Sequence, residues 1–327
     1  MQAPRAPRAP NFCIFNIVRI LSILVLLFSF LSLHGQKEGD VWYTGWVRPS
    51  FSPYISFIDF SNGEPQINNL PNPPLLMESR EATTNVCDRD GNLLFFSNGW
   101  NIYDRTMGEI MNWTPPNLNY IISTGIGQGN LILPVNDSIF YAFVVIPDTT
   151  TFRLESSYAT INRNLNQGLG AITSPRNRVE DSLTEAMSAI RHADGKSWWV
   201  LWHLEKSSGF VKMLLNPDET IQVSYQYVGG IHENVNGESV GRIVFSNQGD
   251  CFAAMEGEGR VGLYDFDRCS GNISYRDSII KNVSPNQVFN GLSFSPSGKY
   301  LYINDVEASD SSVLYQYCLD SANLMSS

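Results

Sequence analysis

Short apolar stretches that alternate with polar turns recur along the chain after its N-terminal segment. The stretch LSFSPSGKYLYINDV at 292–306 shows the pattern: an apolar approach, a Ser-Pro-Ser-Gly turn, then a run rich in Tyr and Ile. Stretches of the same shape occupy 84–99, 131–145, 188–204 and 243–257. Each predicts a β-hairpin, because Gly, Asn and Asp accept the backbone angles that tight two-residue turns require. The turn pairs are Asp90-Gly91, Asn136-Asp137, Asp194-Gly195, Gln248-Gly249 and Ser297-Gly298.

The spacing of these hairpins predicts a repeated four-stranded unit. The turns recur about every 50 residues, close to the length of a propeller blade, and a further strand follows most of them. The strands are also apolar on both faces. In 198–204, Trp198, Val200 and Trp202 share one face, while Trp199 and Leu201 lie on the other. A blade is covered on both sides and a sandwich strand on one, so the pattern predicts an all-β β-propeller of four-stranded antiparallel blades, with a two-domain β-sandwich as the alternative.

The two ends of the repeat array predict an incomplete ring. Residues 41–46 and 54–65 fit the last two strands of a blade, which gives about five full blades plus a half blade out of a parent ring of six or seven. The strands that would complete the first blade are expected after the last predicted strand, where the sequence ends at Ser327. We therefore expect 36–327 to be a β-propeller that lacks its C-terminal closure. The segment 179–191 is short and carries three acidic residues, which predicts a loop or a single helical turn.

Residues 1–35 have the layout of a secretory signal peptide. Arg5, Arg8 and Arg19 are basic, an apolar run follows at 20–33, and the small Gly35 offers a cleavage position. The apolar run is shorter than the roughly 20 residues that a membrane span needs. We expect a secreted or cell-surface protein with no stable membrane insertion after signal cleavage. Retention of 12–33 as an uncleaved anchor is the alternative.

Two long segments resemble one family of proteins. They are SREATTNVCDRDGNLLFFSNGWNIYDRTMGEIMN (79–112) and LTEAMSAIRHADGKSWWVLWHL (183–204), and 261–271 and 289–305 extend the likeness. The chain resembles secreted bacterial WD-repeat-like β-propeller proteins from residue 41 to residue 323. Such proteins often carry C-terminal PKD-like or immunoglobulin-like modules and a type IX secretion sorting domain. The resemblance implies export and a surface role, and it implies no reaction.

Charge and cysteine content limit the kinds of partner and metal site that the sequence predicts. The formal net charge is −10, which argues against a nucleic-acid partner because such proteins need a basic footprint. Beyond the signal segment the cysteines are widely spread and form no CxxC pair, so they do not predict a zinc site. We favour buried free thiols over any particular disulfide, although an exported protein can form either. These cysteines are Cys87, Cys251, Cys269 and Cys318.

One sequence pattern of catalytic serines is present, but the predicted elements around it do not fit a nucleophile elbow. Residues 237–241 read G-x-S-x-G around Ser239. A nucleophile elbow needs a strand before the serine, a helix after it and a later histidine, whereas no histidine follows His232. We interpret His192 and His203 as structural, and His232-Glu233 as a poor metal site on its own. We therefore expect no catalytic residues, no cofactor and no metal site; adventitious Ca²⁺ on the acidic loops stays open.

Tryptophans offer the remaining candidate contacts. Most of the seven are expected to pack between blades, but Trp100 and Trp113 lie near predicted loops and are the two candidates for ligand contact. The sequence thus predicts an exported, non-enzymatic propeller that binds a protein or a glycan as a binding or scaffold module. A propeller hydrolase or lyase with a central pocket is the alternative function. A third hypothesis is the same propeller anchored in a membrane by residues 12–33.

Overall fold

The computed structural model is built from antiparallel β-strands. It describes residues 41–46, 54–61, 63–70, 83–112, 128–148, 150–151, 153–232, 241–257, 259–280, 288–306 and 312–320. The segment predicted as a signal peptide or anchor therefore lies outside the described residues. In the part of the chain that the structure describes, no helix has the length and apolar character needed to cross a bilayer.

The strands form successive sheets, here called blades 1 to 6. Blade 1 contains β1 (Val41–Trp46), β2 (Tyr54–Asp59) and β3 (Gln66–Leu70). Blade 2 contains β4 (Thr84–Cys87), β5 (Leu93–Ser97), β6 (Asn101–Asp104) and β7 (Glu109–Asn112). Blade 3 contains β8 (Asn130–Pro134), β9 (Ile139–Pro147), β10 (Leu154–Asn162) and the first half of β11 (Ala171–Arg191).

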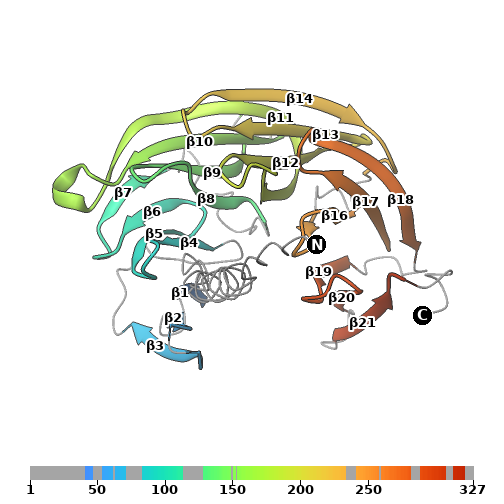
Figure 1. The fold of residues 1–327 in the computed structure, drawn as a ribbon, viewed down its shortest axis with the longest axis horizontal. Helices are drawn as coiled ribbons and strands as arrows, with labels where there is room; N and C mark the ends of the chain where they lie inside the picture. Colours follow the sequence, from blue (N-terminus) through green and yellow to red (C-terminus); the bar gives the residue numbers. More distant parts are fainter. Residues whose placement is uncertain are drawn as a thin grey trace, which may run out of the picture.

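The later blades follow the same order. Blade 4 contains the second half of β11 with β12 (Trp198–Leu204), β13 (Gly209–Leu215) and β14 (Ile221–Tyr227). Blade 5 contains β15 (Ile243–Phe245), β16 (Cys251–Met255), β17 (Arg260–Asp267) and β18 (Asn272–Ile280). Blade 6 contains β19 (Val288–Phe294), β20 (Tyr300–Val306) and β21 (Ser312–Cys318). Figure 1 shows the six blades side by side along an arc, with blades 1 and 6 at its two ends.

The five predicted hairpin turns are confirmed. Each lies between the first and second strand of its blade, from the β4–β5 turn to the β19–β20 turn. Four of their glycines have φ between 69° and 90°, the region that an L side chain rarely adopts. These are Gly91, Gly195, Gly249 and Gly298.

The prediction of a loop or helical turn at 179–191 is wrong, because this segment belongs to the long strand β11. The first half of β11 pairs with β10 and the second half with β12, and Leu183 faces both Leu154 and Leu204 in register. Blades 3 and 4 are thereby joined into one seven-stranded sheet. Positive φ angles at Arg176 and Ser182 accompany the change of register. The acidic residues that argued against a strand lie where β11 passes from one partner to the other.

The hydrophobic core lies between neighbouring blades, as a propeller requires. On β12, Val200 and Trp202 pack against blade 3, while Trp199 and Leu201 pack against blade 5. The alternating clusters continue from blade 1 to blade 6. Burying one such large side chain contributes roughly 1.5–3 kcal/mol. Each of blades 2 to 5 therefore owes its burial to both neighbours, which a two-layer sandwich would not produce.

The ends of the arc differ in detail from the prediction. Blade 1 has a third strand, β3, that the sequence did not indicate because QINNL has little apolar character. If β11 is counted in both of its blades, the described strands make four four-stranded blades and two three-stranded ones, where the sequence predicted five complete blades and a half. That closing strands are missing stays a prediction.

Candidate functional site

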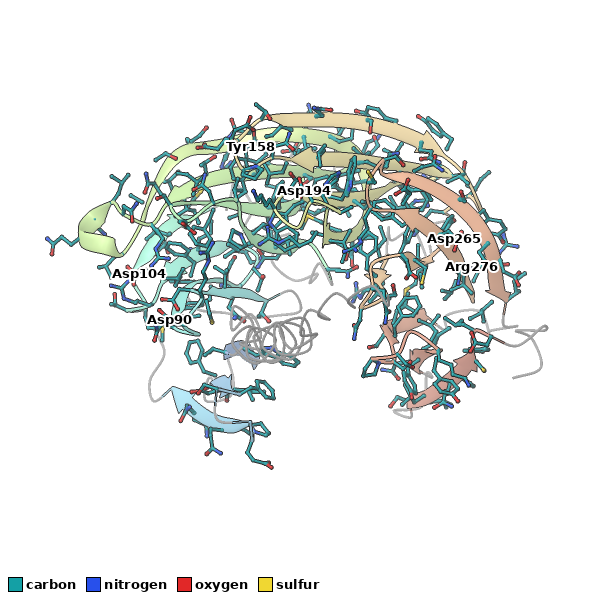
Figure 2. All side chains as sticks on the ribbon, in the orientation of Figure 1. Asp90, Asp104, Tyr158, Asp194, Asp265 and Arg276 are labelled. Carbon is teal, nitrogen blue, oxygen red and sulfur yellow. The ribbon has the colours of Figure 1, made fainter. Side chains whose placement is uncertain are left out.

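The turns of blades 2, 3 and 4 surround a groove of about 570 Å³, here called the turn groove. It lies at the end of the blades where the first strand turns into the second. Figure 2 labels Asp90 and Asp194, which belong to two of these turns. The groove is lined by Cys87, Asp88, Arg89, Pro134, Val135, Asn136, Asp137, Phe140, Arg163, Arg191, Gly195, Lys196 and Pro217.

Each turn around the groove is fixed by one side chain of its own. Asp88 Oδ1 accepts hydrogen bonds from the backbone N–H of Asp90 and Asn92, at 3.0 and 2.9 Å. Asn136 Oδ1 plays the same part in the β8–β9 turn, and Asp194 Oδ1 in the β11–β12 turn. Such side-chain closure is the local reason for Asp and Asn at these positions. The groove is therefore formed by rigid turns.

Hydrogen bonds between blades hold the turns of blades 3 and 4 beside each other. Trp198 Nε1 donates to the carbonyl of Pro134 at 2.8 Å, which joins blade 4 to blade 3. Asn136 Nδ2 donates to the carbonyl of Pro217 at 3.1 Å. Arg89 and Asp137 form a 2.8 Å ion pair between blades 2 and 3, but both side chains are about four-fifths exposed, so water screens this pair and it contributes little.

The groove carries more positive than negative side chains in a chain that is acidic as a whole. Its lining contains four cationic side chains, from blades 2, 3 and 4, and only two carboxylates. The cations are Arg89, Arg163, Arg191 and Lys196. The Arg191 guanidinium lies 3.9 Å from the centre of the Trp198 ring, and its Nη1 donates to the carbonyl of Lys196 at 2.7 Å. Burial opposes ionisation of Asp88, but hydrogen bonds from Asn92 and Asp90 and the charge of Arg163 outweigh it and lower the pKa of this carboxyl.

The structure does not bring Trp100 into the groove. Trp100 lies in the β5–β6 turn, at the opposite end of β5 from the groove, and packs half-buried against the cluster that contains Phe95 and Ile102. Its role as a ligand contact stays a prediction. Trp113 and Ser239 lie outside the described residues.

His192 and His203 each lie against a backbone carbonyl, and that they are structural stays a prediction. His192 Nε2 lies 3.0 Å from the carbonyl of Cys269, and its Nδ1 accepts from the backbone of Asp194. His203 is fully buried and its Nδ1 lies 2.9 Å from the carbonyl of Leu204. Burial, with a smaller effect of the neighbouring His232, lowers the pKa of His203 to about 3. Within the described ranges, no three His, Cys, Asp or Glu side chains are grouped to hold a metal ion.

The four cysteines among the described residues form no disulfide. Cys87 and Cys251 are buried, as expected, whereas Cys269 is exposed and Cys318 is half-buried. The prediction of buried thiols is therefore wrong for Cys269. It lies in the β17–β18 turn, where blade 4 contacts the backbone through His192 and Trp199 but leaves the Cys269 residue exposed.

A second polar feature, absent from the sequence-based candidates, is a buried acid between blades 4 and 5. Glu256 is 2% exposed, and its Oε1 accepts hydrogen bonds from the Tyr264 hydroxyl and from the backbone of Gly230. Its Oε2 has no hydrogen-bond partner. A Cβ at Gly230 or Gly262 would lie within 2.2 Å of this carboxylate, so glycine is required there. Burial raises the pKa of Glu256.

The sequence around Glu256 reads EGEG, one of the short acidic loops of the chain. Nothing local distinguishes it from the others, because Tyr264 and Gly230 meet it only after two blades have packed. The turn groove was missed for the same reason. A signal was nevertheless present: the turns DRDG and DGK place a basic residue beside Asp and Gly.

Comparison with known proteins bears on the fold. No family model and no curated protein matches the sequence. Among solved structures, the β-propeller domain of Cps50 (Swd1) from Myceliophteria thermophila is similar with a TM-score of 0.50 and 13% identity, over 87% of this chain and 81% of that one. The fold is a β-propeller.

Two further likenesses to solved structures are weaker. A quinonprotein alcohol dehydrogenase-like protein from Bacteroides thetaiotaomicron has a TM-score of 0.47 and 12% identity, over 86% of this chain and 64% of that one. The periplasmic gluconolactonase of Pseudomonas aeruginosa has a TM-score of 0.40 and 10% identity, over 85% and 70%. At these identities the likeness concerns the fold alone, and a fold by itself assigns no function.

Proposed function

We propose that this propeller is an exported binding or scaffold module that holds a protein or glycan ligand and catalyses no reaction on it. The observation that carries the proposal is the turn groove. Its walls are turns closed by their own side chains, and its cationic side chains come from three adjacent blades. Concave sites with a few fixed polar groups are the usual form of ligand sites. Rigid blades that present loops suit a surface that must keep its shape.

Export is part of the same proposal. Its support is the layout of residues 1–35, with basic residues, an apolar run and a small residue before the cut. N-terminal sequencing of protein recovered from the medium should give a start close to residue 36. Material that keeps 12–33 and stays with membranes would instead favour the anchored alternative.

The binding role is tested with a charge reversal in the groove and a matched one outside it. Lys196 and Lys299 each follow the glycine of an equivalent turn, in blades 4 and 6, and both are exposed. Screened against glycan arrays and candidate surface proteins, the full chain should bind a ligand that Lys196→Glu weakens and Lys299→Glu does not. Ligand binding that responds equally to both changes would contradict the groove as the site.

A propeller hydrolase or lyase is the second candidate, and the buried Glu256 favours it. A carboxyl with a raised pKa and a tyrosine partner is a combination that acid–base catalysis uses. Chromogenic ester, lactone and glycoside substrates would test this. Turnover that Glu256→Gln abolishes and Lys196→Glu leaves intact would establish an enzyme and overturn the non-enzymatic proposal.

A further inference from the structure

We propose that the turn groove takes a glycan that carries carboxylate groups, held by Arg163, Arg191 and Lys196. This rests on the proposed binding role of the groove and names its ligand chemistry. The three cationic residues line the groove at the junction of blades 3 and 4. Arg163 lies in the β10–β11 turn, Arg191 ends β11, and Lys196 lies in the β11–β12 turn.

The guanidinium of Arg191 is already placed for recognition. The Trp198 ring lies 3.9 Å beneath it, and its Nη1 donates to the carbonyl of Lys196. Trp198 is itself fixed through its Nε1 on the carbonyl of Pro134. A stacked guanidinium loses little conformational freedom on binding, and it keeps a permanent positive charge at the edge of the groove. Arg191 therefore supplies an oriented anion contact.

The carboxylates of the groove argue for a glycan in place of a densely charged polymer. Asp88 and Asp137 line the same groove as the three cations. A ligand with a charge on every unit would meet repulsion from them, and the net charge of −10 opposes its approach. Sugar hydroxyls donate hydrogen bonds to carboxylates, and sugar carboxylates accept them from arginine and lysine. An acidic glycan therefore offers hydrogen-bond donors to the carboxylates of the groove and acceptors to its cations.

The apolar part of the lining fits the same ligand. Pro134, Val135, Phe140 and Pro217 lie among the charged residues, and the C–H faces of sugar rings pack against such surfaces. Because the groove is open to solvent and its cations are screened, binding should weaken steeply as salt rises.

The experiment compares two polymers that differ only in carboxylates: carboxymethyl-dextran and plain dextran. The full chain is immobilised, and affinity for each polymer is measured at low and at high salt. We expect carboxymethyl-dextran to bind and plain dextran to bind at least tenfold more weakly. Arg163→Gln, Arg191→Gln and Lys196→Gln should each lower the affinity by about fivefold or more, because each change removes one positively charged hydrogen-bond donor from the groove. Lys299→Gln, at the equivalent turn of blade 6, should leave it unchanged.

The possible outcomes distinguish failure of the acidic-glycan inference from failure of the proposed binding role of the groove. Equal binding of both dextrans, lost in the groove variants, would overturn the acidic-glycan inference and leave the binding role standing. Tighter binding of poly-glutamate through the same side chains would overturn it in favour of an acidic peptide. No polymer binding in the intact chain, or binding that Lys299→Gln weakens equally, would overturn it as well. Lys196 is exposed, so its variant keeps the test valid even if Arg191→Gln fails to fold.

Discussion

At the scale of single residues, the protein buries the carboxyl group of Glu256 in a space that few side chains could occupy. Glu256 is enclosed by the Tyr264 hydroxyl and by Gly230 and Gly262, which leave no room for a Cβ. Burial favours its protonated form, so its pKa is raised in the folded state. Its contribution to stability is then full below the unfolded-state pKa of about 4.3 and is lost as the pH rises through the higher folded-state value.

Glu256→Gln should remove this pH dependence. The amide stays neutral and keeps an acceptor for Tyr264, so the wild type should lose free energy of unfolding relative to the variant as the pH rises above about 4. Denaturant titrations at several pH values measure this. Glu64→Gln, at an exposed glutamate, serves as the control and should follow the wild type. Parallel curves for Glu256→Gln and wild type would show that the buried carboxyl is not the titrating group.

At the scale of elements, β11 is the unusual strand, because it serves two blades. Leu183 lies where the strand changes partner; it faces Leu154 on β10 and Leu204 on β12 and is fully buried. Packing at this point therefore supports both blades at once.

Leu183→Ala should destabilise the protein by about 2–5 kcal/mol, the usual cost of a cavity left by a buried leucine. The matched control is Leu314→Ala on β21, where the side chain is 67% exposed. That change should stay within about 0.5 kcal/mol. Chemical denaturation of both variants gives the two values. A loss at Leu183 no larger than at Leu314 would mean that the junction of the two blades does not depend on this contact.

The elements also show how far the sequence could predict the structure. The five hairpin turns were predictable because Asp, Asn and Gly act on their own backbone. The strand β3 was missed because its residues are polar, and the middle of β11 because acidic residues there resemble a loop. The turn groove and the Glu256 site depend on which blades become neighbours, and no local pattern contains that information.

At the scale of the whole molecule, stability is shared through the surfaces between blades. Every cluster of buried side chains draws on two neighbouring blades, and blades 2 to 5 have a cluster on each side. A blade that opened alone would expose both faces to water, so we expect the inner blades to unfold together.

The cysteine thiols can report this behaviour. Cys269 is exposed and should react with iodoacetamide in the native protein, whereas Cys87 and Cys251 lie buried in blades 2 and 5. In rising denaturant the last two should become labelled in one common transition, followed by mass spectrometry of their peptides. Two separate transitions would contradict shared stability. Failure of Cys269 to react in the native chain would indicate a disulfide that the structure does not contain.

The strand that blades 3 and 4 share also restricts how this array can change over generations. Repeat proteins gain or lose a module by exchange at equivalent connecting loops, and each module normally touches only its neighbours. Between these two blades no loop exists, because 171–191 is one continuous strand. An exchange there would leave half a strand with an open edge. Additions and deletions of modules in related proteins should therefore fall elsewhere in the ring and keep this pair intact.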